Sequence, residues 1–251
     1  MQTNRSRSVT RVSFVAGDSL FAAGIAHSEM TGVAKVNHSF EGLFTRLQTV
    51  RETWGWQTAG QLVFVAAVDL NSDRQGGLLQ KAEEAGAIID PVDYRDYYPG
   101  PYPGGSTVFV PSIGERSHRS IDHTDDTESD PQSRFRPTLS PRLNFLLGGL
   151  AARLGPLNNS SEVSRAEVLV CAHHYEIKDA LMELKDRGAD VGIAFYRSMM
   201  EPRWERFGLF GSNCPIRFYD LAPHLDDITT LGQRRRLGTR PRPPSAASSL
   251  F

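Results

Sequence analysis

The sequence predicts an α/β domain with a central, mainly parallel β-sheet and a ligand crevice at the ends of its strands. Strand-like and helix-like segments alternate along the chain, and this alternation implies crossover connections between parallel strands. The run Leu62–Val68 is almost continuously apolar, which is typical of a strand covered by helices on both faces. In such sheets ligands bind beyond the carboxyl ends of the strands.

The N-terminal half of the domain begins with a strand at Val12–Val15. A helix is predicted to start near Ser39, because apolar residues recur at helical spacing after it. The strand Leu62–Val68 comes next. Gly77–Ala85 then predicts a helix, since a glycine follows at the usual C-terminal position. A short strand at Ala87–Ile89 completes this half.

The C-terminal half begins with a helix over Leu143–Leu154, for which Ser140 and Pro141 offer an N-cap and a first-turn proline. The clearest strand–helix–strand unit of the sequence follows, and Gly188 is expected to end its helix. These later elements are, in order, the strand Val168–Cys171, the helix Glu176–Arg187, the strand Val191–Phe195 and the strand Ile216–Tyr219.

Composition divides the chain into one domain and its flanking segments. Residues 1–9 predict a disordered leader and residues 10–231 a single domain. Within the domain, residues 114–137 are charged, serine-rich and nearly free of apolar side chains, which predicts a flexible insertion. Residues 232–251 predict a disordered tail, basic and rich in proline and serine.

Bulk charge and cysteine content narrow the function classes. A net charge of -1 gives no global attraction to nucleic acid or to anionic membranes, so any such contact requires a local patch. No run approaches the roughly 18 consecutive apolar residues of a spanning helix, and the start lacks a secretory pattern. Cys171 and Cys214 are too few for a disulfide framework. We therefore expect a cytoplasmic protein without a membrane partner, with Cys171 buried as a small apolar residue.

Two strand ends carry a family resemblance. Residues 16–21 read AGDSLF after the first strand, and residues 172–176 read AHHYE after the fourth. These segments resemble two motifs of the NYN (LabA-like) branch of the PIN-like nuclease superfamily, Asp-Gly-x-Asn-Leu-Phe and Ser-Gly-Asp-x-Asp-Phe. The resemblance spans roughly residues 11–222 and matches in outline rather than letter for letter. It implies a PIN-like three-layer α/β/α fold.

The resemblance also implies a chemistry, which this sequence only partly retains. The family is associated with metal-dependent cleavage of RNA, in which clustered carboxylates hold Mg²⁺ or Mn²⁺. At the matching positions this chain has Ala16, Ser19, His174 and Glu176 in place of three aspartates and an asparagine. Our leading hypothesis is therefore a divergent, catalytically degenerate domain that needs no cofactor and binds RNA or a protein partner.

The alternative is a working endoribonuclease with rearranged ligands. Asp18, His174 and Glu176 would then be the catalytic residues, with Asp18 and Glu176 holding Mg²⁺ or Mn²⁺. Each also has a structural explanation: Asp18 as a turn residue that caps the next segment, the pair His173–His174 in packing, and Glu176 in the first turn of a helix. Ser19 and His173 are further candidates for ligand binding.

Two more features bear on partners. The tail residues Arg234, Arg235 and Arg236 form part of the one concentrated basic patch of the sequence, and such a patch can hold phosphates without sequence preference. An interaction or scaffold protein without a nucleic-acid role is a third alternative. It would use exposed aromatic residues of the loop Tyr94–Tyr98 and the surface around Met199–Met200 and Trp204. A dinucleotide-binding domain is disfavoured, because Gly17 stands alone where that fold has a Gly-x-Gly-x-x-Gly loop.

Overall fold

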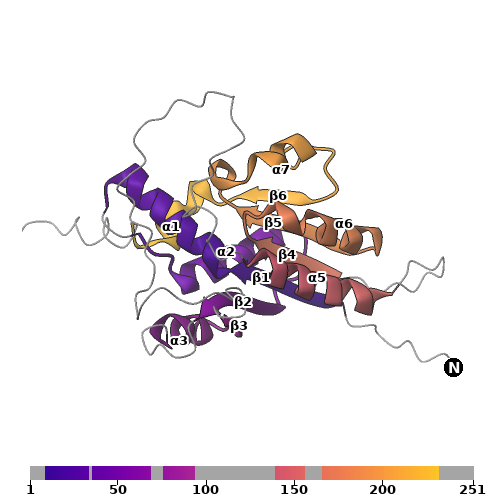
Figure 1. The fold of residues 1–251 in the computed structure, drawn as a ribbon, viewed down its shortest axis with the longest axis horizontal. Coiled ribbons are helices and arrows are strands. Elements are labelled where there is room, and N and C mark those ends of the chain that lie inside the picture. The colour runs from indigo at the N-terminus through magenta and orange to yellow at the C-terminus, as the bar shows by residue number, and fades with distance from the viewer. Residues whose placement is uncertain (1–8, 34–35, 69–75, 94–138, 156–165, 232–251) are drawn as a thin grey trace, which may run out of the picture.

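A computed structural model describes residues 9–33, 36–68, 76–93, 139–155 and 166–231. Within them, six strands form one sheet in the order β3-β2-β1-β4-β5-β6, and every neighbouring pair is parallel (Figure 1). The α/β class with a central parallel sheet is thus confirmed. The strands are β1 (Thr10–Ala16), β2 (Gln61–Val68), β3 (Ile88–Asp93), β4 (Ala166–Cys171), β5 (Asp190–Phe195) and β6 (Arg217–Asp220).

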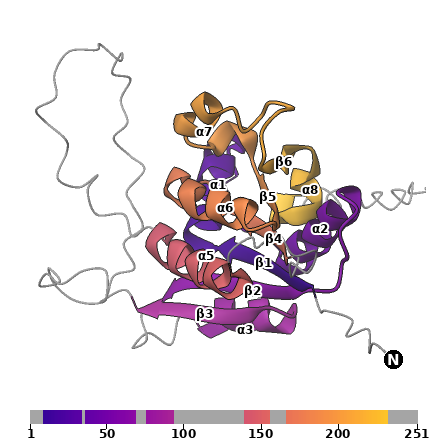
Figure 2. The same cartoon turned by 90° about the vertical axis from the view of Figure 1, so that its right-hand side faces the viewer.

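Helices cover both faces of this sheet and complete three layers. α5 packs against α6 on one side of the strands, whereas α2 packs against α8 and α3 on the other (Figure 2). The α-helices are α1 (Gly17–Thr31), α2 (Phe40–Thr53), α3 (Gly76–Glu84), α5 (Ser140–Leu154), α6 (Lys178–Asp186), α7 (Pro202–Phe207) and α8 (Leu225–Ile228). Short 3₁₀ helices are η4 (Tyr175–Ile177), η5 (Arg197–Met199) and η6 (Ala222–His224).

The core is built around the two central strands. β1 lies between β2 and β4, with Val15 paired to Phe64 on one side and to Cys171 on the other. Residues on both faces of β4 are fully buried, as a strand covered by two helical layers requires. Cys171 is buried as expected, and burial raises the pKa of its thiol to about 12.

Local signals in the sequence account for several helix ends. The Ser39 hydroxyl accepts a hydrogen bond from the Gly42 amide at 3.3 Å and caps α2 as predicted. Gly86 and Gly188 follow α3 and α6 with φ of 93° and 80°, a conformation that favours glycine. The prediction for α5 was wrong by one residue at its cap. Ser140 is already helical and Leu139 stands at the N-cap position without a side-chain bond, although Pro141 lies in the first turn as expected.

The largest difference from the sequence prediction is α1, which the prediction lacked. This helix begins at Gly17, directly after β1. Its buried stripe consists mainly of small and polar residues, so no apolar period marked it. That stripe is Ser19, Leu20, Ala23, Gly24 and His27.

Other boundaries shift slightly, and some predictions concern segments that the structure does not describe. The predicted helix Glu176–Arg187 is a 3₁₀ turn followed by α6. The insertion at 114–137, the loop Tyr94–Tyr98, the tail 232–251 and nearly all of the leader 1–9 lie outside the described residues. Among the helices that are described, none combines the length and the apolar character needed to cross a bilayer.

Candidate functional site at the carboxyl edge of the sheet

The candidate site lies where the strand order reverses. From β1 the chain proceeds to β2 on one side, while β4 lies on the other side of β1. Helices that follow two such strands leave the sheet on opposite faces, which opens a crevice between the strand ends. Asp18 and Ser19 lie in the first turn of α1, and His173 and His174 follow β4. The fold therefore brings together the two segments on which the family resemblance rests.

Asp18 and His174 are in direct contact. Nε2 of His174 lies 2.8 Å from Oδ2 of Asp18. The same oxygen accepts a hydrogen bond from the Leu139 amide at 2.8 Å, and Oδ1 accepts one from the Ser19 amide at 2.7 Å. Burial raises the pKa of Asp18, but the hydrogen bond and charge of His174 and the Leu139 amide outweigh it, so that the pKa lies below its usual value. Asp18 is an ionised carboxylate with three donors from the protein itself.

Ser19 and His173 form the inner wall of the site. The Ser19 hydroxyl lies 2.8 Å from Nδ1 of His173 and is fully buried. Burial, and then the charge of His174, lower the pKa of His173 to about 4, so its imidazole is neutral at pH 7. The indole N–H of Trp204 donates to the His173 carbonyl at 3.0 Å. A serine beside a histidine can serve as a nucleophile, but a fully buried hydroxyl gives a substrate no access.

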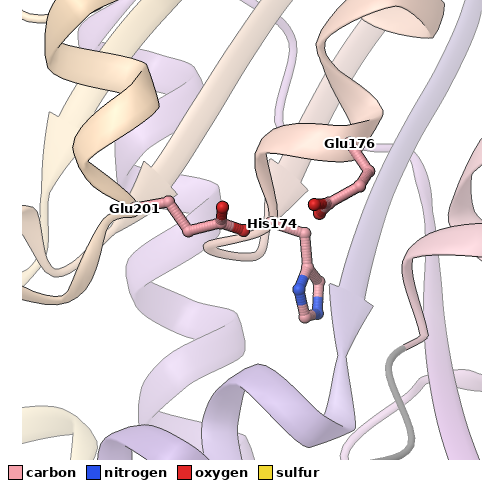
Figure 3. A group of neighbouring side chains, drawn as sticks. All are labelled: His174, Glu176 and Glu201. Carbon is pink, nitrogen blue, oxygen red and sulfur yellow. The ribbon is translucent and has the colours of Figure 1, made fainter. Parts of the chain in front are cut away.

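A cluster of one histidine and two glutamates, called the acid cluster below, lies at the exposed side of the crevice. His174, Glu176 and Glu201 place one potential ligand atom each within 4.8 Å of one another. Figure 3 shows the two carboxylates approaching from opposite sides above the imidazole of His174. Glu176 lies in η4, and Asn144 of α5 donates to its carbonyl at 3.2 Å. Within the described residues this is the group whose donors suit a metal ion, and it does not include Asp18.

The sequence did not predict Glu201 as a residue of the site. It directly precedes α7, in the segment that follows β5. Because β5 neighbours β4 in a parallel sheet, its carboxyl end meets the same edge. The sequence signal that could have identified Glu201 is an acid followed by a proline at the start of a helix, one short loop after the strand β5. The family motifs around β1 and β4 gave no reason to look there.

An arginine already bridges the two glutamates. Nη2 of Arg203 lies 2.5 Å from Oε1 of Glu176 and 2.6 Å from Oε2 of Glu201. The other oxygen of Glu201 accepts from the Tyr175 amide at 2.9 Å. Burial raises the pKa of Glu176, yet its own backbone amide and Arg203 outweigh this and hold it below the usual value. Arg203 and Glu176 are 47% and 44% exposed, so solvent weakens their attraction.

An open cavity of about 490 Å³ adjoins the acid cluster through Glu201. Arg197 lies over the ring of Phe210 in its wall, 4.5 Å from the ring centre. Asp220, at the end of β6, accepts hydrogen bonds there from the backbone amides of Arg197 and Ala222. The cavity therefore lies beyond the carboxyl ends of β5 and β6.

One condition set for the scaffold hypothesis fails. It required exposed side chains around Met199–Met200 and Trp204, but Trp204 is fully buried and Met200 is 8% exposed. Trp204 packs against Tyr175 in the core below the site. The tail residues Arg234, Arg235 and Arg236 lie outside the described residues, so the structure does not place them at the crevice.

Comparisons with family models, with curated proteins and with solved structures find no match for this chain. The functional argument therefore depends on the residues of the site and their contacts.

Proposed function

We propose that this chain is a divergent PIN-like domain that binds single-stranded RNA at the carboxyl edge of its sheet without hydrolysing it. One observation carries the proposal: the carboxylates of Asp18, Glu176 and Glu201 are already bonded to donors of the protein itself. Metal-dependent hydrolysis needs such carboxylates as ligands for Mg²⁺ or Mn²⁺. Here the imidazole of His174 and the guanidinium of Arg203 occupy the positions in which that chemistry needs metal ions.

The rim of the site offers contacts suited to RNA. Arg203 lies 4.9 Å from the centre of the Tyr175 ring and Arg197 lies 4.5 Å from that of Phe210. Both arginines are exposed and both rings are partly buried. Guanidinium groups pair with phosphates through two hydrogen bonds, and aromatic rings stack on unpaired bases. Because Nη2 of Arg203 is bonded to Glu176 and Glu201, we assign the phosphate contact to Arg197, which lies in the wall of the cavity together with Phe210.

A second candidate function is a metal-dependent endoribonuclease with rearranged ligands. The observation in its favour is the group His174, Glu176 and Glu201, whose donor atoms lie within 4.8 Å of one another. An ion that displaced Arg203 would find one nitrogen and two oxygen ligands there. Of the ligands expected from the sequence, Glu176 belongs to this group and Asp18 does not; Asp18 would instead orient His174.

Binding and cleavage assays on one labelled RNA separate these functions. Fluorescence anisotropy with a fluorescein-labelled single-stranded RNA is expected to show binding that weakens several-fold in Arg197→Gln, because a phosphate contact is lost. Arg187→Gln is the matched control, since Arg187 is paired with Glu183 at the C-terminal end of α6, on the opposite edge of the sheet. Absence of RNA binding by the unaltered protein would contradict the proposal and favour a protein partner. Cleavage with Mn²⁺ that Glu176→Gln abolishes would establish the second candidate instead.

A further inference from the structure

The guanidinium of Arg203 lies between two carboxylates. A single atom, Nη2, lies 2.5 Å from a Glu176 oxygen and 2.6 Å from a Glu201 oxygen. These two carboxylates and His174 form the group whose donor atoms are all within 4.8 Å of one another. The positively charged nitrogen thus lies between carboxylate oxygens of two of the three residues that would hold a metal ion.

We propose that Arg203 is a tethered cation that occupies a divalent-metal site formed by His174, Glu176 and Glu201 and competes with free ions for it. The inference concerns the same site as the proposed function and rests on its non-catalytic character, because it names the residue that competes with metal there. It also makes a claim of its own: the site without the guanidinium is competent to bind metal.

The spacing of the donors supports a metal site. An ion bound at about 2.1 Å in tetrahedral geometry places its ligand atoms about 3.4 Å from one another. The donor atoms here lie within 4.8 Å of one another, so the glutamate side chains, which are at least partly exposed, would close by up to about 1.4 Å on binding an ion. One imidazole and two carboxylates suit Zn²⁺ or Mn²⁺ better than Mg²⁺, which prefers oxygen ligands throughout.

The surroundings of His174 support the same assignment. Asp18 lies 2.8 Å from Nε2 of His174 and is itself fixed by the Leu139 and Ser19 amides. A carboxylate that hydrogen-bonds one ring nitrogen commonly orients a histidine so that its other nitrogen ligates a metal. His174 is 6% exposed, so its ring is also held by packing. The orientation of this ligand is therefore built into the fold.

Exposed ion pairs contribute little each, so the competition from Arg203 is modest. Two such pairs correspond to a difference in metal affinity of about tenfold. We therefore expect Arg203→Gln to bind Zn²⁺ or Mn²⁺ about ten times more tightly than the unaltered protein does. Glutamine retains polarity and bulk but carries no positive charge.

The experiment is isothermal titration of the metal-free, full-length protein with MnCl₂ or ZnCl₂. Arg206→Gln is the matched control, because Arg206 is an exposed arginine of the same helix α7 and its removal changes the net charge equally. Arg203→Gln is expected to bind one ion, the control to match the unaltered protein, and Arg203→Gln combined with Glu201→Gln to lose the gain. Circular dichroism establishes that each variant is folded, and Arg203→Met replaces Arg203→Gln if the latter is not.

Two results would overturn the proposal. Equal metal affinity in Arg203→Gln and Arg206→Gln would show that Arg203 does not compete with ions. Absence of binding in folded Arg203→Gln would show that the three donors do not form a metal site. Neither result depends on RNA, so failure of the RNA-binding proposal is seen separately in the anisotropy of the unaltered protein.

Discussion

The carboxylate of Asp18 and the imidazole of His174 lie 2.8 Å apart and join the ends of two neighbouring parallel strands. In the family that the sequence resembles, these strand ends would bring together aspartates, whose mutual repulsion a metal ion offsets. A carboxylate and an imidazole do not repel each other, and here they form a direct hydrogen bond, which needs no metal ion between them. The crevice is therefore stable as a network of protein groups, which accords with a binding role.

Removing the Asp18 charge tests how much this contact contributes. Asp18→Asn keeps an oxygen for the Leu139 amide but weakens the bond to His174, so we expect a loss of about 1–3 kcal/mol in the free energy of unfolding. Urea unfolding at pH 7 measures it. Asp179→Asn is the control, because Asp179 is 87% exposed, and it is expected to change stability by less than about 0.5 kcal/mol. Equal losses in both variants would contradict the role given to Asp18.

Stability is expected to fall as the solution becomes acidic. The pKa of His173 is about 4 in the folded protein and 6.5 without the fold. Between these values the unfolded chain binds more protons than the folded protein does. Protonation of His173 therefore has no effect on stability above about pH 6.5 and lowers the free energy of unfolding as the pH falls toward 4. Burial and the charge of His27 lower the pKa of His38 to about 3, which acts in the same direction. Asp18, whose pKa is also lowered, adds a further loss below about pH 4.

Urea unfolding at pH 7, 6 and 5 measures this dependence. His173→Gln and His38→Gln are each expected to flatten the fall between pH 6.5 and 5, because each removes one group that the fold keeps neutral. A slope unchanged in both variants would contradict the assignment. A rise in stability toward pH 5 in the unaltered protein would do so as well.

Two glycines within helices are expected to respond in opposite directions to alanine. A Cβ atom at Gly42 in α2 would clash with the Asp227 carbonyl oxygen, whereas at Gly148 in α5 it meets nothing within 4 Å. Gly42→Ala should therefore cost about 1–3 kcal/mol through overpacking. Gly148→Ala should stabilise by about 0.5–1 kcal/mol, because alanine is the better helix former. Thermal and urea unfolding of both variants provide the comparison, and destabilisation by Gly148→Ala would refute it.

The amino edge of the sheet holds a buried ion pair that should matter for stability. Arg51 is 2% exposed, lies 2.8 Å from Glu167 and donates to the Gln57 carbonyl. Arg51→Ala is expected to cost about 3–5 kcal/mol, because it removes a buried side chain and leaves the partly buried Glu167 carboxylate with the more distant Arg11, 3.7 Å away. Arg187→Ala removes the exposed pair with Glu183 and should cost less than about 1 kcal/mol. Similar losses in urea unfolding would contradict the difference in burial.

The sequence predicted the sheet well because its strands have strong, simple signals. Apolar runs predicted β2, β4 and β5 as strands, the first of them covered on both faces, and the structure buries most of the side chains of the three strands taken together. α1 escaped because helix periodicity depends on apolar residues, and its buried face is built mainly of serine, alanine, glycine and histidine. Close approach of backbones explains that composition: a Cβ at Gly24 would lie 2.6 Å from the Val36 carbonyl oxygen.

The candidate site was only half visible in the sequence. Asp18, Ser19, His173, His174 and Glu176 follow two strands whose motifs marked them, and the parallel order of the sheet brings these segments together. Glu201 and Arg203 come from the segment after β5, where no motif drew attention. Which arginine pairs with which glutamate depends on the path of that loop and not on local sequence. The pairing of Arg203 with the two glutamates could therefore be seen only in the three-dimensional structure.

We propose that the site binds RNA without hydrolysing it. The most direct measurement is one reaction: the unaltered protein with fluorescein-labelled single-stranded RNA and millimolar MnCl₂, followed by anisotropy and then by a denaturing gel. We predict a rise in anisotropy with the RNA intact. RNA that is cleaved by the unaltered protein and spared by Glu176→Gln, or anisotropy that never rises, would contradict the claim.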